Sequence, residues 1–196
     1  MTDLNLDTFW QNEKNEHFEA AEKTFATMQN EFSRLLEACT KCISNGGKIM
    51  FFGNGGSASD AQHLATELTV RFIKDRKPIP AIALTTDTST LTAIGNDFGF
   101  DHLFSRQIEA LGKKGDIAIG ISTSGTSPNI LGGLKMAHEK GLINVGFSGR
   151  DGGTMPNLCD ICLIVPSHIT SRIQEMHITL GHMLCGALEQ KLGLTE

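Results

Sequence analysis

Short apolar runs alternate with longer segments of helical periodicity along most of this chain. The apolar runs predict five β-strands, at Ile49–Phe52, Ala81–Leu84, Asp116–Ile121, Ile143–Phe147 and Ile161–Val165. Apolar residues spaced three and four apart predict helices at Ser57–Glu67, Asp87–Asp97, His102–Leu111, Pro128 to about Lys140, and Ile169 to about Leu192. Such alternation predicts an α/β three-layer sandwich, with a five-stranded parallel sheet of the flavodoxin or Rossmann-like kind flanked by helices. Ligands of these folds bind beyond the carboxyl ends of the strands.

The first 46 residues carry no strand pattern. Asp7 to about Gly46 reads as helix, broken near Met28–Asn30, with an apolar stripe along its first half. We expect one domain over residues 1–196, made of a helical arm (1–46) and an α/β core with its C-terminal helix (47–196). Because such an arm has no partner within a minimal core, it is predicted to pack against another subunit.

Composition narrows the functional classes. The 196 residues carry a net charge of −5 without a Lys/Arg-rich run, which argues against a nucleic-acid surface. The N-terminus lacks the basic region and apolar core of a signal peptide, and no apolar run is long enough to cross a bilayer. We therefore expect a cytoplasmic protein with no nucleic-acid or membrane partner.

The chain has five cysteines, and two pairs of them have CxxC spacing. Cys39 and Cys42 fall within a helical pattern and are predicted to face the core. Cys159 and Cys162 enter the fifth predicted strand, where residues three apart point to opposite faces. Neither pair fits a zinc knuckle, so buried, reduced thiols are expected.

The stretch KIMFFGNGGSASDAQHLATE predicts a strand, a tight turn and a helix. Its glycines allow close approach of the backbone to a ligand, and Ser57 and Ser59 add hydroxyls where the helix exposes unpaired N–H groups. This arrangement suits a phosphate. Nucleotide binding is disfavoured, because no Lys follows the glycines and Ala58 occupies the last glycine position of the dinucleotide motif.

A second loop, STSGTS at 122–127, follows the third predicted strand and precedes Pro128 at a helix start. Its five hydroxyls supply neutral hydrogen-bond donors for a phosphate, whereas a simple N-cap needs only one.

His63 and Glu67 lie one helical turn apart and therefore share a face. In the last helix, Gln174 and His182 are among the polar residues that interrupt an apolar sequence. Together these four could hold a divalent metal such as zinc. A solvated helix pair and satisfied core residues remain the alternatives.

Four blocks, GNGGSASDAQHLATEL, IGNDFGF, GISTSGTSPN and RIQEMH, closely resemble the bacterial phosphoheptose isomerases, which are sugar-isomerase (SIS) domain proteins. The resemblance runs across nearly the whole chain. It implies an aldose–ketose isomerase that converts sedoheptulose 7-phosphate to D-glycero-D-manno-heptose 7-phosphate, the entry to ADP-heptose for lipopolysaccharide core. It also implies a homotetramer with sites at subunit interfaces.

The resemblance assigns roles to individual residues. Glu67 and His182 match the catalytic pair of the family, and one zinc ion per subunit would be held by His63, Glu67, Gln174 and His182. Glu67 also matches a substrate-contacting position, with Asn54, Gly55, Gly56, Ser57, Asn96, Asp97, Ser122, Thr123, Ser124, Ser127 and Gln174. Isomerisation through an enediol needs a base at carbon and an acid near the oxygens, for which Glu67 and His182 are the candidates.

Two other functions stay open at this point. One is a non-catalytic SIS-domain adaptor of the DnaA initiator-associating type, although that type does not keep the residues that match Glu67 and His182. The other is an isomerase for a different phosphosugar, which only a substrate panel would distinguish.

Overall fold

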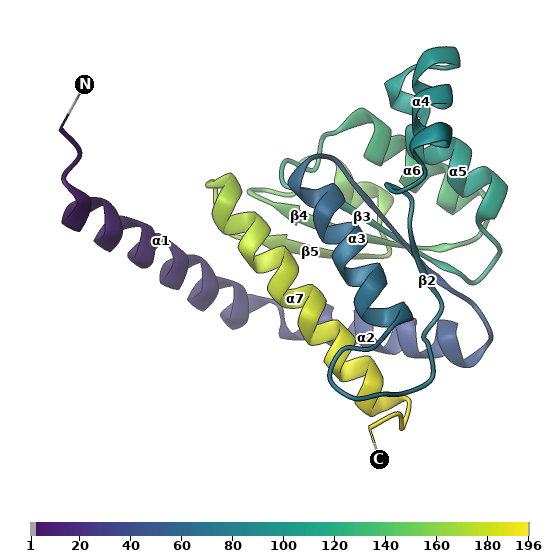
Figure 1. Ribbon diagram of the computed structural model, residues 1–196, viewed down its shortest axis with the longest axis horizontal. Helices are drawn as coiled ribbons and strands as arrows, with labels where there is room; N and C mark the ends of the chain where they lie inside the picture. Colours follow the sequence, from purple (N-terminus) through teal and green to yellow (C-terminus); the bar gives the residue numbers. More distant parts are fainter. Residues whose placement is uncertain (1–2, 196) are drawn as a thin grey trace.

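A computed structural model of the protein describes residues 3–195, and its centre is one parallel sheet with the strand order β2-β1-β3-β4-β5 (Figure 1). The strands are β1 (Ile49–Gly53), β2 (Ala81–Ala83), β3 (Ile117–Ser122), β4 (Ile143–Gly149) and β5 (Ile161–Val165). All neighbouring strands run parallel. The predicted α/β sandwich with five parallel strands is thus confirmed.

Helices cover both faces of the sheet (Figure 1). On one face lie α2 (Gln29–Ser44), α3 (Gly56–Thr69), α7 (Thr170–Lys191) and the end of α1 (Leu6–Thr27). The other face carries α4 (Thr88–Asp97), α5 (Leu103–Leu111) and α6 (Pro128–Glu139), with 3-10 turns η1 (Phe100–His102) and η2 (Met155–Leu158). None of the helices within residues 3–195 combines the length and the hydropathy that a membrane crossing requires.

The central strands are buried on both faces, which explains their continuous apolar runs. Ile49 and Phe51 of β1 join the cluster under α3 and α7, while Met50 and Phe52 join the cluster under α5 and α6. Each such side chain contributes about 1.5–3 kcal/mol when it leaves water. The sheet is therefore a rigid base for the loops at its carboxyl edge.

Helix α1 runs away from the sheet as a long arm (Figure 1). Of its residues only Ala20 and Thr24 are buried. Its large apolar side chains are exposed to solvent: Leu6, Phe9, Trp10, Phe18 and Phe25. The predicted break between two helices is confirmed at Met28, which ends α1 and precedes α2.

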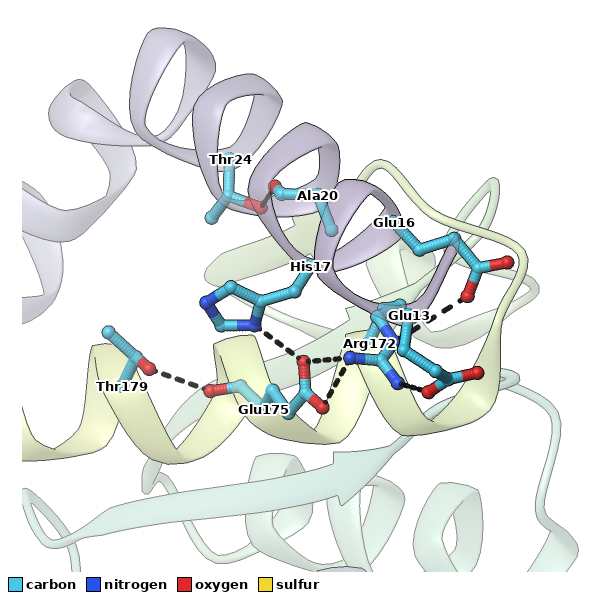
Figure 2. A network of polar contacts seen from close by, with 8 residues as sticks. All are labelled: Glu13, Glu16, His17, Ala20, Thr24, Arg172, Glu175 and Thr179. Atoms are coloured by element: carbon cyan, nitrogen blue, oxygen red, sulfur yellow. Dashed lines mark hydrogen bonds and ion pairs between the residues drawn. The ribbon is translucent and has the colours of Figure 1, made fainter. Parts of the chain in front are cut away.

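A polar network holds α1 against the start of α7 (Figure 2). The guanidinium of Arg172, largely buried, contacts Glu175 on its own helix at 2.8 Å and Glu13 on α1. His17 Nδ1 lies 2.8 Å from the other oxygen of Glu175. Because Arg172 has carboxylates on both helices, the arm leaves the core in a defined direction.

The two CxxC pairs differ in outcome. Cys39 and Cys42 are buried on α2, as expected. The expectation that Cys159 and Cys162 face opposite sides is wrong, since both pack against the cluster under α5 and α6. Cys159 precedes the first residue of β5, and a bend at Asp160 breaks the alternation.

Candidate active site

The first loop joins β1 to α3 at the carboxyl edge of the sheet. Gly55 has φ +57°, which a residue with a side chain rarely adopts, and the N–H of Ser57 donates to the Asn54 carbonyl at 3.0 Å. At Gly56 a Cβ would lie 2.5 Å from Nε2 of Gln174, so a side chain here would displace the Gln174 amide. The start of α3 is therefore open on one side and closed by Gln174 on the other.

Asn54 is fixed by a residue that the sequence did not suggest. The side-chain amides of Asn54 and Asn129, at the start of α6, donate to each other at 2.8 and 2.9 Å. Asn129 is buried, and its Oδ1 also accepts the N–H of Ile130. This reciprocal pair ties the first loop to the helix that follows the second loop.

The second loop carries a cluster of hydroxyls. Oγ of Ser122 lies 3.2 Å from Oγ of Ser127 and 3.5 Å from Oγ of Ser124, and it accepts the N–H of Gly125. Gly53 pairs with Ile121 in the neighbouring strand, so the two loops leave the sheet side by side. Their N–H and O–H groups converge without a Lys or Arg in either loop, an arrangement suited to a phosphate.

His63, Glu67 and His182 form a second cluster further along α3 and α7. Nε2 of His63 lies 3.1 Å from Oε1 of Glu67 and 3.1 Å from Nε2 of His182. The helices pack closely here because Gly181 has no side chain to collide with Leu64. One ligand atom from each of the three residues lies within 4.8 Å of the others.

This cluster faces an open surface. The side chains of His63 and Glu67 are 48% and 23% exposed, so a ligand can reach both. The ring of Phe72 stacks on His182 at 5.5 Å, and beside them runs a groove of about 530 Å³ that Thr179 and Met183 also line. Proton-handling groups that solvent and substrate can both reach are arranged as general acid–base catalysis requires.

The loops and the cluster are separated along α3. At 1.5 Å per residue, His63 lies about 10 Å and Glu67 about 16 Å along the helix axis from Gly56. A phosphorylated sugar with its phosphate at one end and its carbonyl at the other spans a gap between an anion site and acid–base groups. The geometry therefore suits a long-chain sugar phosphate better than a compact one.

Other predicted site residues lie apart from the His63–Glu67–His182 cluster. Asn96 and Asp97 end α4 on the opposite face of the sheet, where Nδ2 of Asn96 donates to Asp97 at 2.7 Å. Within residues 3–195, no hydrogen bond joins either of them to α3 or α7. Gln174 packs against Gly56, two helical turns before His182. One copy of the chain does not gather the whole predicted set.

Asp60 is a site residue that the sequence reasoning missed, although it lies one turn before His63 on the same face of α3. Its Oδ2 is buried without a hydrogen-bond partner among the described residues. Burial raises the pKa of this carboxyl to about 6, and nearby His63 only partly opposes the shift. The i, i+3 spacing to His63 was the available signal.

His177, a further polar residue of the last helix, lies in the core. Its Nε2 is 2.9 Å from the carbonyl oxygen of Ser148. Burial lowers the pKa of this imidazole to about 4, although the Ser148 carbonyl partly opposes the shift. A neutral ring that bonds to the end of β4 holds α7 in place and leaves His182 as the accessible imidazole of that helix.

Replacing Asp60 by asparagine is expected to stabilise the metal-free protein above pH 6 and to change little at pH 4. The pKa of Asp60 is higher in the folded state than in the unfolded state, where it is about 3.9. Such a carboxyl stabilises the fold at pH values below the unfolded-state pKa, and this stabilisation is lost as the pH rises through the folded-state pKa. Melting temperatures with a chelator at both pH values measure the effect.

The matched control is Asp87→Asn at the N-cap of α4, where the N–H of Thr90 lowers the pKa of the carboxyl. This variant should lose stability at neutral pH, the opposite sign. Equal shifts in the two variants would contradict the role of burial at Asp60.

Residues 14–149 match the family model of the SIS domain. The phosphoheptose isomerase of Paramagnetospirillum magneticum is 57% identical over 182 residues, which cover 93% of this chain and 95% of that protein. The solved phosphoheptose isomerase of Neisseria gonorrhoeae has a TM-score of 0.90 at 42% identity and covers 95% of this chain and 100% of its own. The solved phosphoheptose isomerase of Francisella tularensis has a TM-score of 0.91 at 37% identity, and the match covers 96% of this chain and 100% of that protein.

Proposed function

Since this chain belongs to the phosphoheptose isomerases, a family of SIS-domain proteins, we propose that it interconverts sedoheptulose 7-phosphate and D-glycero-D-manno-heptose 7-phosphate. The observation that carries the proposal is that Glu67 of α3 and His182 of α7 converge at one place, at a distance from two loops suited to bind a phosphate. The phosphate on C7 and the reacting C1 and C2 lie at opposite ends of this sugar, which matches the separation between the loops and the cluster.

Glu67 and His182 divide the proton transfers in this proposal. The carboxylate of Glu67 removes the proton from the carbon beside the carbonyl and returns it to the neighbouring carbon. The imidazole of His182 gives a proton to the carbonyl oxygen and takes one from the adjacent hydroxyl. Their link through His63 fixes the orientation of both groups.

The same residues fit a zinc ion. Two imidazole nitrogens and a carboxylate oxygen that converge from His63, Glu67 and His182 are a donor set that zinc takes. Gln174 is the fourth ligand by resemblance, and its part stays a prediction because its amide lies against Gly56. When bound, the ion would polarise the sugar carbonyl.

The phosphate loop gives a prediction of its own. Ser122→Ala or Ser124→Ala should weaken sugar phosphate binding by roughly 1–3 kcal/mol, the cost of leaving a charged acceptor short of a hydrogen bond. Measured KM values and competition by inorganic phosphate report the effect. Ser105→Ala, on exposed α5, is the control and should bind normally. Unchanged KM in both loop variants, without competition by phosphate, would remove the phosphate role from this loop.

We further propose a homotetramer with active sites shared between subunits. The exposed apolar side chains of α1 and the separation of Asn96 and Asp97 from the cluster support this assembly. Light scattering at micromolar concentration should give a mass about four times the 21.2 kDa of one chain. Trp10→Glu on the arm should lower that mass and the activity together. A stable monomer with full activity would contradict both ideas.

The experiment that tests the function is conversion of sedoheptulose 7-phosphate by the purified protein, followed by NMR of the sugar. Hexose, pentose and aminosugar phosphates complete the panel. Turnover of the heptose phosphate above all others supports the proposal. Preference for another sugar would indicate a different isomerase, and binding without turnover of any sugar would indicate the adaptor function.

A further inference from the structure

Cys159 and Cys162 form a thiol pair outside the isomerase site. Cys159 follows η2, the chain bends at Asp160, and Cys162 is the second residue of β5. Both cysteines are partly buried and pack against the same apolar cluster. The pair lies where β5 begins, whereas the phosphate loops follow the ends of β1 and β3. The two cysteines therefore have no role in the proposed isomerisation.

Gly146 of β4 makes room for the pair. It is the register partner of Cys162 in the neighbouring strand. A Cβ at this glycine would lie 2.9 Å from Sγ of Cys159 and 2.7 Å from Sδ of Met155. Cys159 therefore lies over Gly146. Strands β4 and β5 are about 4.8 Å apart, so the side chain of Cys162 leaves β5 beside Cys159.

The two thiols differ in acidity. A hydrogen bond to Cys162, together with burial, raises the pKa of the Cys159 thiol, and the same hydrogen bond lowers the pKa of Cys162 in spite of burial. By contrast, burial raises the pKa of the Cys185 thiol to about 12. Cys162 is thus the thiol of the pair that ionises more readily, and Cys159 keeps its proton.

Small molecules can reach Cys159. Cys159 lines a surface cavity of about 350 Å³, together with Leu158 and Asp160 from its own segment. The opposite wall is the end of α6, with Lys135, His138 and Glu139. Lys135 supplies a positive charge to this cavity, and Glu139 and Asp160 supply negative ones.

We propose that Cys159 and Cys162 are a redox site that closes to a disulfide by exchange with a small peptide disulfide such as oxidised glutathione. The Cys162 thiolate takes the proton of Cys159 while the sulfur of Cys159, which lines the cavity, attacks one sulfur of the oxidant. The S–S bond of the oxidant breaks, and the first glutathione leaves as a thiolate. Cys162 then attacks the Cys159 sulfur of the mixed disulfide and releases the second. Two protein sulfurs are oxidised and one disulfide is reduced to two thiols. The two leaving glutathione thiolates take the proton of Cys159 and one proton from water.

The test is a thiol count on the folded full-length protein after equilibration with glutathione redox buffers. Alkylation and mass spectrometry should show two of the five thiols protected, a mass lower by two hydrogen atoms, and a peptide linked between residues 159 and 162. Cys39 and Cys42 are the internal control, since they have the same spacing but are buried on α2. They should stay reduced in the same sample.

Single variants distinguish the order of attack. Cys162→Ser should trap one glutathione on Cys159, and Cys159→Ser should trap none or react much more slowly. The proposal is overturned if all five thiols stay free in buffers that oxidise a small reference dithiol to its disulfide. A disulfide between Cys39 and Cys42, in place of one between Cys159 and Cys162, would also overturn it. The wild-type thiol count decides the matter even if a variant fails to fold.

Discussion

Glu67→Gln is expected to lower kcat by about 10²- to 10⁴-fold, the contribution of a well-placed general base. Glutamine keeps the size of the side chain and can still bond to His63, but it cannot accept a proton from carbon. Sugar phosphate binding should survive, because the phosphate loops at the other end of the site are unchanged. Steady-state kinetics and calorimetric binding of the substrate separate the two effects.

Deuterium exchange makes this prediction specific to the base. In heavy water the wild type should place deuterium on the carbon next to the carbonyl, because a carboxylate on an open surface exchanges its proton between abstraction and return. The Gln variant should show neither isomerisation nor exchange. If the Gln variant exchanges at the wild-type rate, Glu67 binds a ligand or stabilises the fold, and another group is the base. Glu109→Gln, a surface residue of α5 near Arg106, is the matched control and should behave as the wild type.

The local parts of this architecture could be predicted from the sequence. Strands buried on both faces give unbroken apolar runs, so β1, β3, β4 and β5 were each placed within two residues at either end. The one-turn spacing of His63 and Glu67 follows from helix geometry alone. The short turn η1 was missed, because three residues carry no periodicity.

Long-range contacts explain what the sequence did not predict. Asn54 and Asn129 are 75 residues apart, and nothing in either segment indicates their reciprocal hydrogen bonds. His182 reaches His63 because Gly181 allows α7 to approach Leu64, which is a packing result and not a spacing rule. The polar residues of the last helix had suggested His182 as one of four metal ligands, and resemblance to a family added its catalytic role.

A buried ion pair between Arg76 and Glu189 belongs to the same class of unpredicted contacts. Their side chains are 1% and 0% exposed, and Nε of Arg76 lies 2.8 Å from Oε1 of Glu189. The carboxylate also accepts the N–H of Phe72, and the guanidinium donates to the carbonyl of Glu67. The pair thus joins the end of α3, which carries the candidate base, to the end of α7.

Arg76→Met is expected to lower the free energy of unfolding by about 3–5 kcal/mol, because it leaves a carboxylate buried without its partner. For a chain of this length that corresponds to a fall in Tm of roughly 6–20 °C. Urea denaturation of wild type and variant measures the difference. Lys23→Met, which removes an exposed pair with Glu19, is the control and should leave the free energy of unfolding almost unchanged.

The double variant Arg76→Met with Glu189→Gln tests the cause of that loss. The glutamine oxygen can still accept the N–H of Phe72 but carries no charge, so the double variant should be more stable than Arg76→Met alone. Burial would raise the pKa of Glu189, but bonds from Phe72 and Arg76 outweigh it and lower the pKa. The stability from this lowered pKa is present above the unfolded pKa of about 4.3 and is lost as pH falls further. A double variant no more stable than Arg76→Met at pH 7 would show that lost packing around the guanidinium, and not the unpaired charge, dominates.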